Sequence, residues 1–300
     1  MINEVLESYI KAGTIAANAL KRAEDTVHEG QDVLDICEDL EGYIIKQGGF
    51  PAFPVNISQN EEAAHYTAKP EDDKKIAKGS IVKIDLGTHV NGYIADTAIT
   101  INFSPAYEGM KIANHETLLQ AIDRIRSGMS FEEFGGIVQK LARGYGFKPI
   151  ENLMGHGVDH YNLHANVSIP MVQARARGSF VEGNAYAIEP FFVDGNASGY
   201  VIDGAHSNIY RLPSARAIRE RAHADIIRYI WENYVTLPFA LRWVYRQFGE
   251  SAKNAINELE KRGIIEGYMT LVESSGSYVS QFEHTIIVKN GKALITSIKQ

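Results

Sequence analysis

The chain has 300 residues, of which 45% are hydrophobic, and a formal net charge of −7 at pH 7. Such a length can bury one large core or two smaller ones, and the acidic balance argues against generic binding of a phosphate backbone. The single cysteine, Cys37, excludes an internal disulfide and is interpreted as a packing residue in a reducing compartment. No apolar run reaches the roughly 18 residues of a membrane span, and the first residues lack the order of a signal peptide. We therefore predict a soluble, cytoplasmic protein.

Two helices and a proline-containing segment are predicted at the N-terminal end. Apolar residues at helical spacing run through the first twenty or so positions, and a second helix is predicted from about Asp32 to Gln47. Pro51 and Pro54 are incompatible with a helix interior and with a central strand. An ordered loop is therefore predicted over residues 49–68.

A β-hairpin is predicted over residues 81–101, where apolar strands flank an Asn-Gly pair. Helical periodicity follows over 106–126, and Ser130 begins a capping box for another helix that ends near Gly144. Residues 178–191 then have the pattern of a turn followed by a strand. Two helices followed by acid-bearing strands, twice over, indicate an internal duplication with a site between the halves.

Residues 208–263 have a different character, with helices broken by prolines and a glycine before the last forty residues return to strand patterns. Ten Lys/Arg stand against six Asp/Glu between Arg211 and Arg262. A basic helical segment could contact RNA, although a solvated helical face is the favoured interpretation. We predict a core domain of 1–207 plus 264–300, interrupted by an inserted helical subdomain over 208–263.

Asp85 and Asp96 lie on opposite arms of the predicted hairpin. A two-residue turn places Asp85 opposite Ala98, with Asp96 as its diagonal neighbour, whereas a register shift of two would place the carboxylates directly opposite. Either arrangement lets the two acids hold a pair of metals about 3.5–4 Å apart. Burying acids without a cation is costly, so metal ligands are favoured over exposed strand acids.

Three histidines follow one another at intervals of four residues, at His156, His160 and His164. Gly155 and Gly157 argue against a helix there. A turn at the GHG sequence and an extended LHANVSIP segment would instead present the first and last histidines from different elements. Imidazole can bind a metal or donate a proton, so one of these two is assigned to each task, and the middle one is assigned a structural role.

Glu189 and Glu283 each interrupt an apolar strand, and a shared metal would explain both. His284 must face the opposite side of its strand from Glu283. The chain has no HExxH, GxSxG, phosphate-loop or CxxC motif, so other common hydrolase and zinc-finger interpretations lack support. Four carboxylates and one imidazole suit two adjacent divalent cations: Asp85, Asp96, His156, Glu189 and Glu283.

Five ordered motifs span essentially the whole chain: FPVNISQNEEAAHYTA, KIDLGTHVNGYIADTA, GHGVDHYNLH, YAIEPF and QFEHTIIV. Together they resemble methionine aminopeptidases of the second type, in the short, archaeal-like form without a basic N-terminal extension. The resemblance implies an α+β, pseudo-symmetric pita-bread fold of the creatinase and aminopeptidase type. It also implies that the insertion over 208–263 is a small helical subdomain similar to a winged helix.

The resemblance implies a role for each candidate metal ligand. Asp85 matches a bidentate ligand of one metal, while Asp96 and Glu283 match residues that bridge both metals. His156 and Glu189 match the ligands of the second metal. The implied cofactors are two divalent cations, with cobalt, manganese, iron and zinc all compatible with these ligands.

The resemblance also implies residues that contact substrate. His65 and His164 match the two histidines that touch the substrate and the transition state. The positions that match the walls of the methionine pocket are Phe53, Leu163, His206 and Tyr268. His206 lies in the context AHSNIY, which is the loosest match of the four.

The implied reaction is metal-dependent removal of the N-terminal methionine from nascent proteins and peptides, with a small second residue preferred. A hydroxide that bridges the two cations would attack the scissile carbonyl, and Glu189 would relay a proton to the leaving amine. Nascent polypeptide N-termini are the expected partners of a monomeric enzyme, with a transient ribosome contact left open. No membrane and no specific nucleic acid are expected as partners.

Two alternatives are weighed against this function. A proline-directed aminopeptidase or creatinase relative would share the metal ligands but lack the helical insertion. A binding protein on the same fold would have lost catalysis, and disrupted ligands would be expected. The first motif, the insertion and the five intact ligand positions favour the methionine enzyme.

Overall fold

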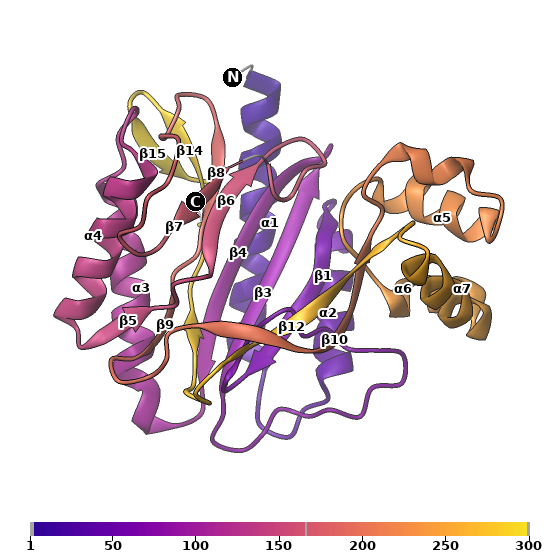
Figure 1. Ribbon diagram of the computed structural model, residues 1–300, viewed down its shortest axis with the longest axis horizontal. Helices are drawn as coiled ribbons and strands as arrows, with labels where there is room; N and C mark the ends of the chain where they lie inside the picture. Colours follow the sequence, from indigo (N-terminus) through magenta and orange to yellow (C-terminus); the bar gives the residue numbers. More distant parts are fainter. Residues whose placement is uncertain (1–2, 166, 299–300) are drawn as a thin grey trace.

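The computed structural model describes residues 3–165 and 167–298, and it has an α+β fold built from two halves (Figure 1). In the first half, two helices pack against a three-stranded antiparallel sheet in the order β1-β3-β4. The apolar faces of both helices and one face of this sheet share a single core cluster. The elements are α1 (Asn3–Thr26), α2 (Val33–Lys46), β1 (Phe50–Gln59), β3 (Ile81–Val90) and β4 (Tyr93–Asn102).

The second half repeats this arrangement with two helices against a five-stranded sheet in the order β15-β14-β8-β6-β7. Its helices are α3 (Glu108–Asp123) and α4 (Phe131–Gly144). Its strands are β6 (Met154–Val158), β7 (Ser168–Pro170), β8 (Ala185–Ile188), β14 (His284–Lys289) and β15 (Lys292–Ile295). A smaller sheet, β13-β9-β5, lies beside α3 and consists of β5 (Phe147–Pro149), β9 (Phe191–Asp194) and β13 (Ser280–Gln281).

A four-stranded sheet, β11-β10-β12-β2, connects this core to a separate group of helices. Figure 1 shows the two long strands of this sheet crossing the molecule and leading to the helices drawn in orange to gold. The strands are β2 (Glu62–Ala64), β10 (Val201–Arg211), β11 (Phe239–Ala240) and β12 (Glu266–Glu273). The helices are α5 (Ala224–Tyr234), α6 (Leu241–Phe248) and α7 (Glu250–Lys261), and they have a hydrophobic cluster of their own. None of the helices in the described chain has the length and apolar content of a membrane span.

The boundaries of the predicted insertion differ from the observed elements. The first residues of the 208–263 segment belong to strand β10, so the helical part begins only after Arg211. Short 3-10 helices over Pro105–Tyr107 and Ala215–Arg219 precede α3 and α5. The division into a catalytic domain and an inserted subdomain stays a prediction.

Two local predictions were wrong, and backbone chemistry explains the first. The loop predicted over 49–68 contains β1, which stands at one end of the sheet order β1-β3-β4 and is therefore an edge strand. Register shifts on either side of Phe53 accommodate the two prolines, because proline cannot donate to a ladder hydrogen bond. The second is the turn predicted at GHG, which lies within β6; the LHANVSIP segment includes residue 166, outside the described residues, and becomes a strand from Ser168.

The hairpin and the predicted helix cap are confirmed. Val90 pairs with Tyr93 and Asp85 with Ala98, which is the register set by a two-residue turn. Ser130 precedes α4, and its hydroxyl accepts a hydrogen bond from the Glu133 N–H at 3.1 Å.

The two halves meet along β4 and the segment that precedes β14. Ala98 and Glu283 form a β-bridge, and the Thr97 hydroxyl donates to the Glu283 carbonyl at 2.7 Å. The Asp96 N–H donates to the Thr285 hydroxyl at 2.7 Å. These contacts fix acids from opposite ends of the sequence beside one another.

Gly13 allows α1 to approach the C-terminal segment closely. A Cβ at this position would lie 2.1 Å from the Thr296 carbonyl oxygen, whereas a Cβ at Gly42 in α2 would meet nothing within 4 Å. We expect Gly13→Ala to lower the free energy of unfolding by about 2 kcal/mol through overpacking. Gly42→Ala is the matched control and should raise it by up to about 1 kcal/mol. Urea denaturation of both variants checks this, and equal stabilisation by the two alanines would contradict it.

Candidate metal centre

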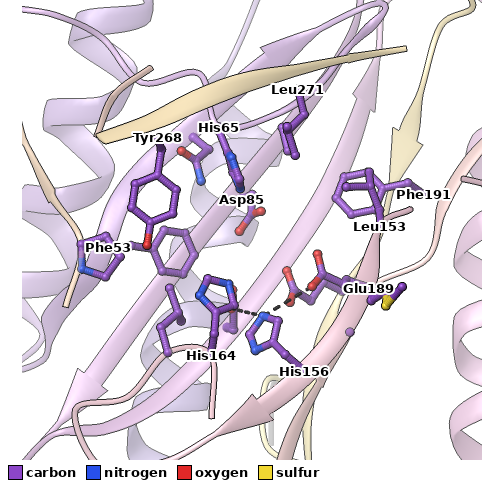
Figure 2. A pocket seen from close by; sticks show the side chains of 18 of the residues that line it. Phe53, His65, Asp85, Leu153, His156, His164, Glu189, Phe191, Tyr268 and Leu271 are labelled. Carbon is purple, nitrogen blue, oxygen red and sulfur yellow. Dashed lines mark ion pairs between the residues drawn. The ribbon is translucent and has the colours of Figure 1, made fainter. Parts of the chain in front are cut away.

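The five candidate ligands converge on one cavity, with a volume of about 530 Å³, from both halves of the fold. Asp85 comes from β3 and Asp96 from β4. His156 lies in β6, Glu189 follows β8, and Glu283 stands between β13 and β14. Figure 2 shows His156 beside Glu189, with Asp85 across the cavity from them. The structure thus brings together all five side chains that the sequence singled out.

His156 stands close to two of the acids, and its Nε2 faces them. Its Nε2 lies 3.6 Å from Asp96 Oδ2 and 3.4 Å from Glu189 Oε1. One ligand atom each from Asp96, His156 and Glu283 lies within 4.8 Å of the others. The Nδ1 of His156 is 3.2 Å from the Gly157 carbonyl, which can only accept, so Nδ1 carries the hydrogen and Nε2 is free to bind a cation.

Burial and mutual repulsion perturb the acids strongly when no cation is bound. Burial raises the pKa of Asp85 to about 7. Burial and the neighbouring carboxylates raise the pKa values of Asp96, Glu189 and Glu283 well above the ordinary range. Burial lowers the pKa of His156 to about 4, so its imidazole is neutral near pH 7. Four acids around one neutral imidazole form a site whose combined charge two divalent cations would neutralise.

The hydrogen bonding of these acids also fits a metal site. Within the described part of the chain, four buried carboxylate oxygens have no hydrogen-bond partner: Asp85 Oδ1, Asp96 Oδ1 and both Oε atoms of Glu283. Buried polar atoms are nearly always paired, so a cluster of unpaired oxygens needs a specific explanation. Divalent cations bound by these oxygens would provide it.

Neighbouring polar side chains that the sequence interpretation missed hold the ligands in place. Gln281 Nε2 donates to Asp85 Oδ2 at 3.0 Å, and the Thr285 hydroxyl donates to the Asp96 carbonyl at 2.8 Å. Asn56 lines the cavity and pairs with Asp85 in the β1–β3 register. Strand alternation could have indicated them, because Gln281 and Thr285 each stand two residues from Glu283 and residues two apart in a strand lie on the same face.

His65 and His164 both line the cavity, but their ring nitrogens have different surroundings. His65 Nδ1 lies 3.1 Å from the Met269 carbonyl, so Nδ1 carries the hydrogen and the other nitrogen is an acceptor in the neutral ring. Burial lowers the pKa of His65, and burial together with neighbouring histidines lowers that of His164 to about 3. The His164 ring contacts the His156 ring, with centroids 4.4 Å apart. Two neutral imidazoles therefore face the cavity beside the acids.

Three of the four predicted pocket-wall residues line the cavity: Phe53, Leu163 and Tyr268. His206 is not among the described residues that line it, and its Nε2 pairs with Glu260 Oε1 at 2.9 Å. This geometry does not place His206 at the pocket wall. Figure 2 shows apolar walls on two sides of the acids, including three side chains not predicted from sequence: Leu153, Phe191 and Leu271.

Comparison with known proteins shows the family to which this chain belongs. The model of metallopeptidase family M24 matches residues 7–290. A methionine aminopeptidase from Saccharolobus solfataricus is 41% identical over 304 residues, which cover 100% of this chain and 99% of the relative. The chain belongs to the methionine aminopeptidases of family M24. This membership confirms the predicted metal-dependent methionine aminopeptidase activity and the need for divalent cations, with the metal identity left open.

Solved structures similar to this methionine aminopeptidase support the fold. Methionine aminopeptidase from Thermotoga maritima aligns with a TM-score of 0.71 at 22% identity, covering 99% of this chain and 98% of that chain. A thermophilic Arx1 aligns with a TM-score of 0.82 at 18% identity, covering 99% of this chain and 91% of that chain. The predicted α+β pita-bread fold is therefore confirmed.

Proposed function

We propose that this methionine aminopeptidase releases methionine from nascent polypeptides with a small second residue, using two divalent cations. The proposed ligands are Asp85, Asp96, His156, Glu189 and Glu283. The observation that carries this assignment is the set of buried, unpaired carboxylate oxygens beside the free Nε2 of His156. Cations bound there would offset the repulsion among the acids and make water a stronger nucleophile near neutral pH.

Glu189 is proposed as the group that moves the proton during hydrolysis. Its carboxylate lines the cavity, and Oε1 lies 3.4 Å from His156 Nε2. In this role it accepts a proton from the attacking water and delivers it to the nitrogen of the departing peptide. The scissile C–N bond breaks, and free methionine leaves with the hydroxyl of water on its carboxyl carbon.

The two cavity histidines are assigned complementary roles. The Met269 carbonyl fixes the hydrogen of His65 on Nδ1, so its Nε2 accepts a hydrogen bond from a peptide N–H of the substrate. His164 is the proposed donor to the substrate carbonyl, where negative charge develops. Both rings are neutral near pH 7 because burial lowers their pKa values.

The apolar walls beside the acids supply the proposed methionine pocket. Phe53, Leu163 and Tyr268 line the same cavity as the acids and fit an unbranched thioether side chain. Buried carboxylates at one end would attract the free α-amino group, which explains exopeptidase action. A monomeric, cytoplasmic enzyme stays a prediction, with a transient ribosome contact, the identity of the metal and the detailed second-residue preference left open.

The test is release of free amino acid from Met-Ala-Ser and Leu-Ala-Ser by the whole chain, loaded in turn with manganese, cobalt, iron and zinc. We expect turnover of the methionine peptide and much slower turnover of the leucine peptide. The proposed pocket fits an unbranched side chain, and the leucine side chain is branched at Cγ. Equal turnover of both would overturn the pocket assignment. Inactivity with every metal would favour the binding-protein alternative.

A further inference from the structure

A buried ion pair between Arg242 and Glu41 joins α6 to α2. Arg242 in α6 is 2% exposed and Glu41 in α2 is 4% exposed. Arg242 Nη2 donates a hydrogen bond to Glu41 Oε1, and Trp243 Nε1 donates to Glu41 Oε2 at 2.8 Å. Burial raises the pKa of Glu41, while the Arg242 guanidinium and the Trp243 N–H oppose that rise.

The pair also holds two backbone segments that lead into the cavity. Glu41 Oε1 accepts from the Val55 N–H at 3.1 Å. Arg242 Nη1 donates to the Thr67 hydroxyl at 2.8 Å and to the Ala68 carbonyl at 3.2 Å. The Thr67 hydroxyl in turn donates to the Val55 carbonyl at 2.7 Å, which closes the network.

Each segment held in this way carries a residue that lines the cavity. Val55 stands two residues after Phe53, and Thr67 stands two residues after His65. His65 has φ of 71°, a backbone state that a non-glycine residue keeps only where its surroundings hold it. Arg242 itself is four residues after Pro238, which also lines the cavity.

We propose that Arg242 and Glu41 are positioning residues that set the methionine-binding wall through Phe53, His65 and Pro238. A buried ion pair is an inefficient stabiliser, because desolvation offsets most of its attraction. Its hydrogen bonds instead fix the positions of three backbone segments that converge on the wall. The proposed metal ligands come from other strands, so we expect loss of this pair to leave metal binding unchanged.

The main test is the double variant Glu41→Leu/Arg242→Met, which leaves no unpaired buried charge. We expect KM for Met-Ala-Ser to rise about 10-fold, because a small displacement of binding groups is costly, while kcat stays within about 3-fold. Metal content per chain should not change. The ratio of Met-Ala-Ser turnover to Leu-Ala-Ser turnover should fall in the double variant, because the methionine-binding wall is held less firmly.

A neighbouring ion pair supplies the matched control. Arg246 and Glu38 also join α6 to α2, but their side chains are 55% and 46% exposed. Glu38→Gln/Arg246→Gln should leave KM, kcat and the peptide ratio unchanged. A matching rise in KM in this control would show that any loosening of the two helices suffices, which would overturn the specific role of the buried pair.

Thr67→Val provides a milder test that keeps the ion pair intact. It removes one hydroxyl, so KM should rise about 3-fold, and Thr67→Ser should restore the wild-type value. If both the double variant and Thr67→Val lower only the melting temperature and leave KM unchanged, the pair is structural and the inference fails. The inference rests on the proposed function: an inactive wild-type enzyme would refute that function, whereas an active wild type with unchanged variants would refute only this inference.

Discussion

Glu283→Gln is expected to reduce kcat/KM for Met-Ala-Ser by about 10³-fold, equivalent to roughly 4 kcal/mol of transition-state stabilisation. Both Oε atoms of Glu283 are buried without a hydrogen-bond partner and stand close to Asp96 and His156. An amide replaces one negative charge by a neutral and much weaker ligand. Metal analysis of the purified variant should therefore give less than the wild-type metal content per chain.

The same substitution should change stability in opposite directions with and without metal. Burial and the neighbouring carboxylates raise the pKa of Glu283 in the metal-free protein, so folding at neutral pH must protonate this group at a cost in free energy; a neutral amide avoids that cost and should raise the melting temperature of the metal-free form. Added metal should raise the melting temperature of the wild type more than that of the variant, since ligands stabilise only the state that binds them. Equal metal-induced shifts would contradict a ligand role for Glu283.

His284→Asn is the matched control for Glu283→Gln because it lies next to Glu283 but faces away from the cavity. His284 Nδ1 is 3.0 Å from the Ser297 hydroxyl. This variant should lose some stability and keep its metal content, KM and kcat. A loss of metal as large as that of Glu283→Gln would mean that any disturbance of this segment disrupts the site.

Glu189→Gln is expected to lower kcat by about 10²–10⁴-fold, the usual contribution of a positioned proton-transfer group. The amide has nearly the same shape but cannot accept and release a proton. The variant should therefore lose more activity per bound metal than Glu283→Gln loses. The measurement is single-turnover hydrolysis of Met-Ala-Ser, normalised to metal content.

Two results would separate the possible roles of Glu189. Wild-type activity per bound metal in Glu189→Gln would show that another group moves the proton. If Glu189→Gln loses nearly all of its metal and its residual activity is proportional to the metal that remains, Glu189 acts only as a metal ligand. Glu182→Gln serves as a control, because this exposed acid accepts hydrogen bonds from the Asn290 and Gly291 N–H groups and is not among the described residues that line the cavity.

Local patterns predicted the parts of the site that depend on nearby residues. The Asn-Gly turn fixes the hairpin register, and that register places Asp85 and Asp96 diagonally on one face. Alternation along a strand likewise separates Glu283 from His284. Both predictions depend only on residues that lie within about twenty positions of one another in the sequence.

The contacts that complete the site are non-local, and local patterns do not specify them. Gln281 reaches Asp85 from the other end of the chain, and the Ala98 bridge to Glu283 depends on how the halves dock. The prolines of β1 obscured an edge strand, since a proline is tolerated where no ladder bond is needed. His206 was assigned from a loose motif, and its pairing with Glu260 could not be read from spacing.

The bridge between Ala98 and Glu283 has a consequence for the order in which the enzyme matures. A ribosome makes the N-terminal half first, so Asp85 and Asp96 are made long before Glu283, and four of the five proposed ligands precede it. Those early acids lack both their partners and the contact that closes the cavity. We therefore expect the complete metal site to form only after the strands that carry Glu283 have docked against β4.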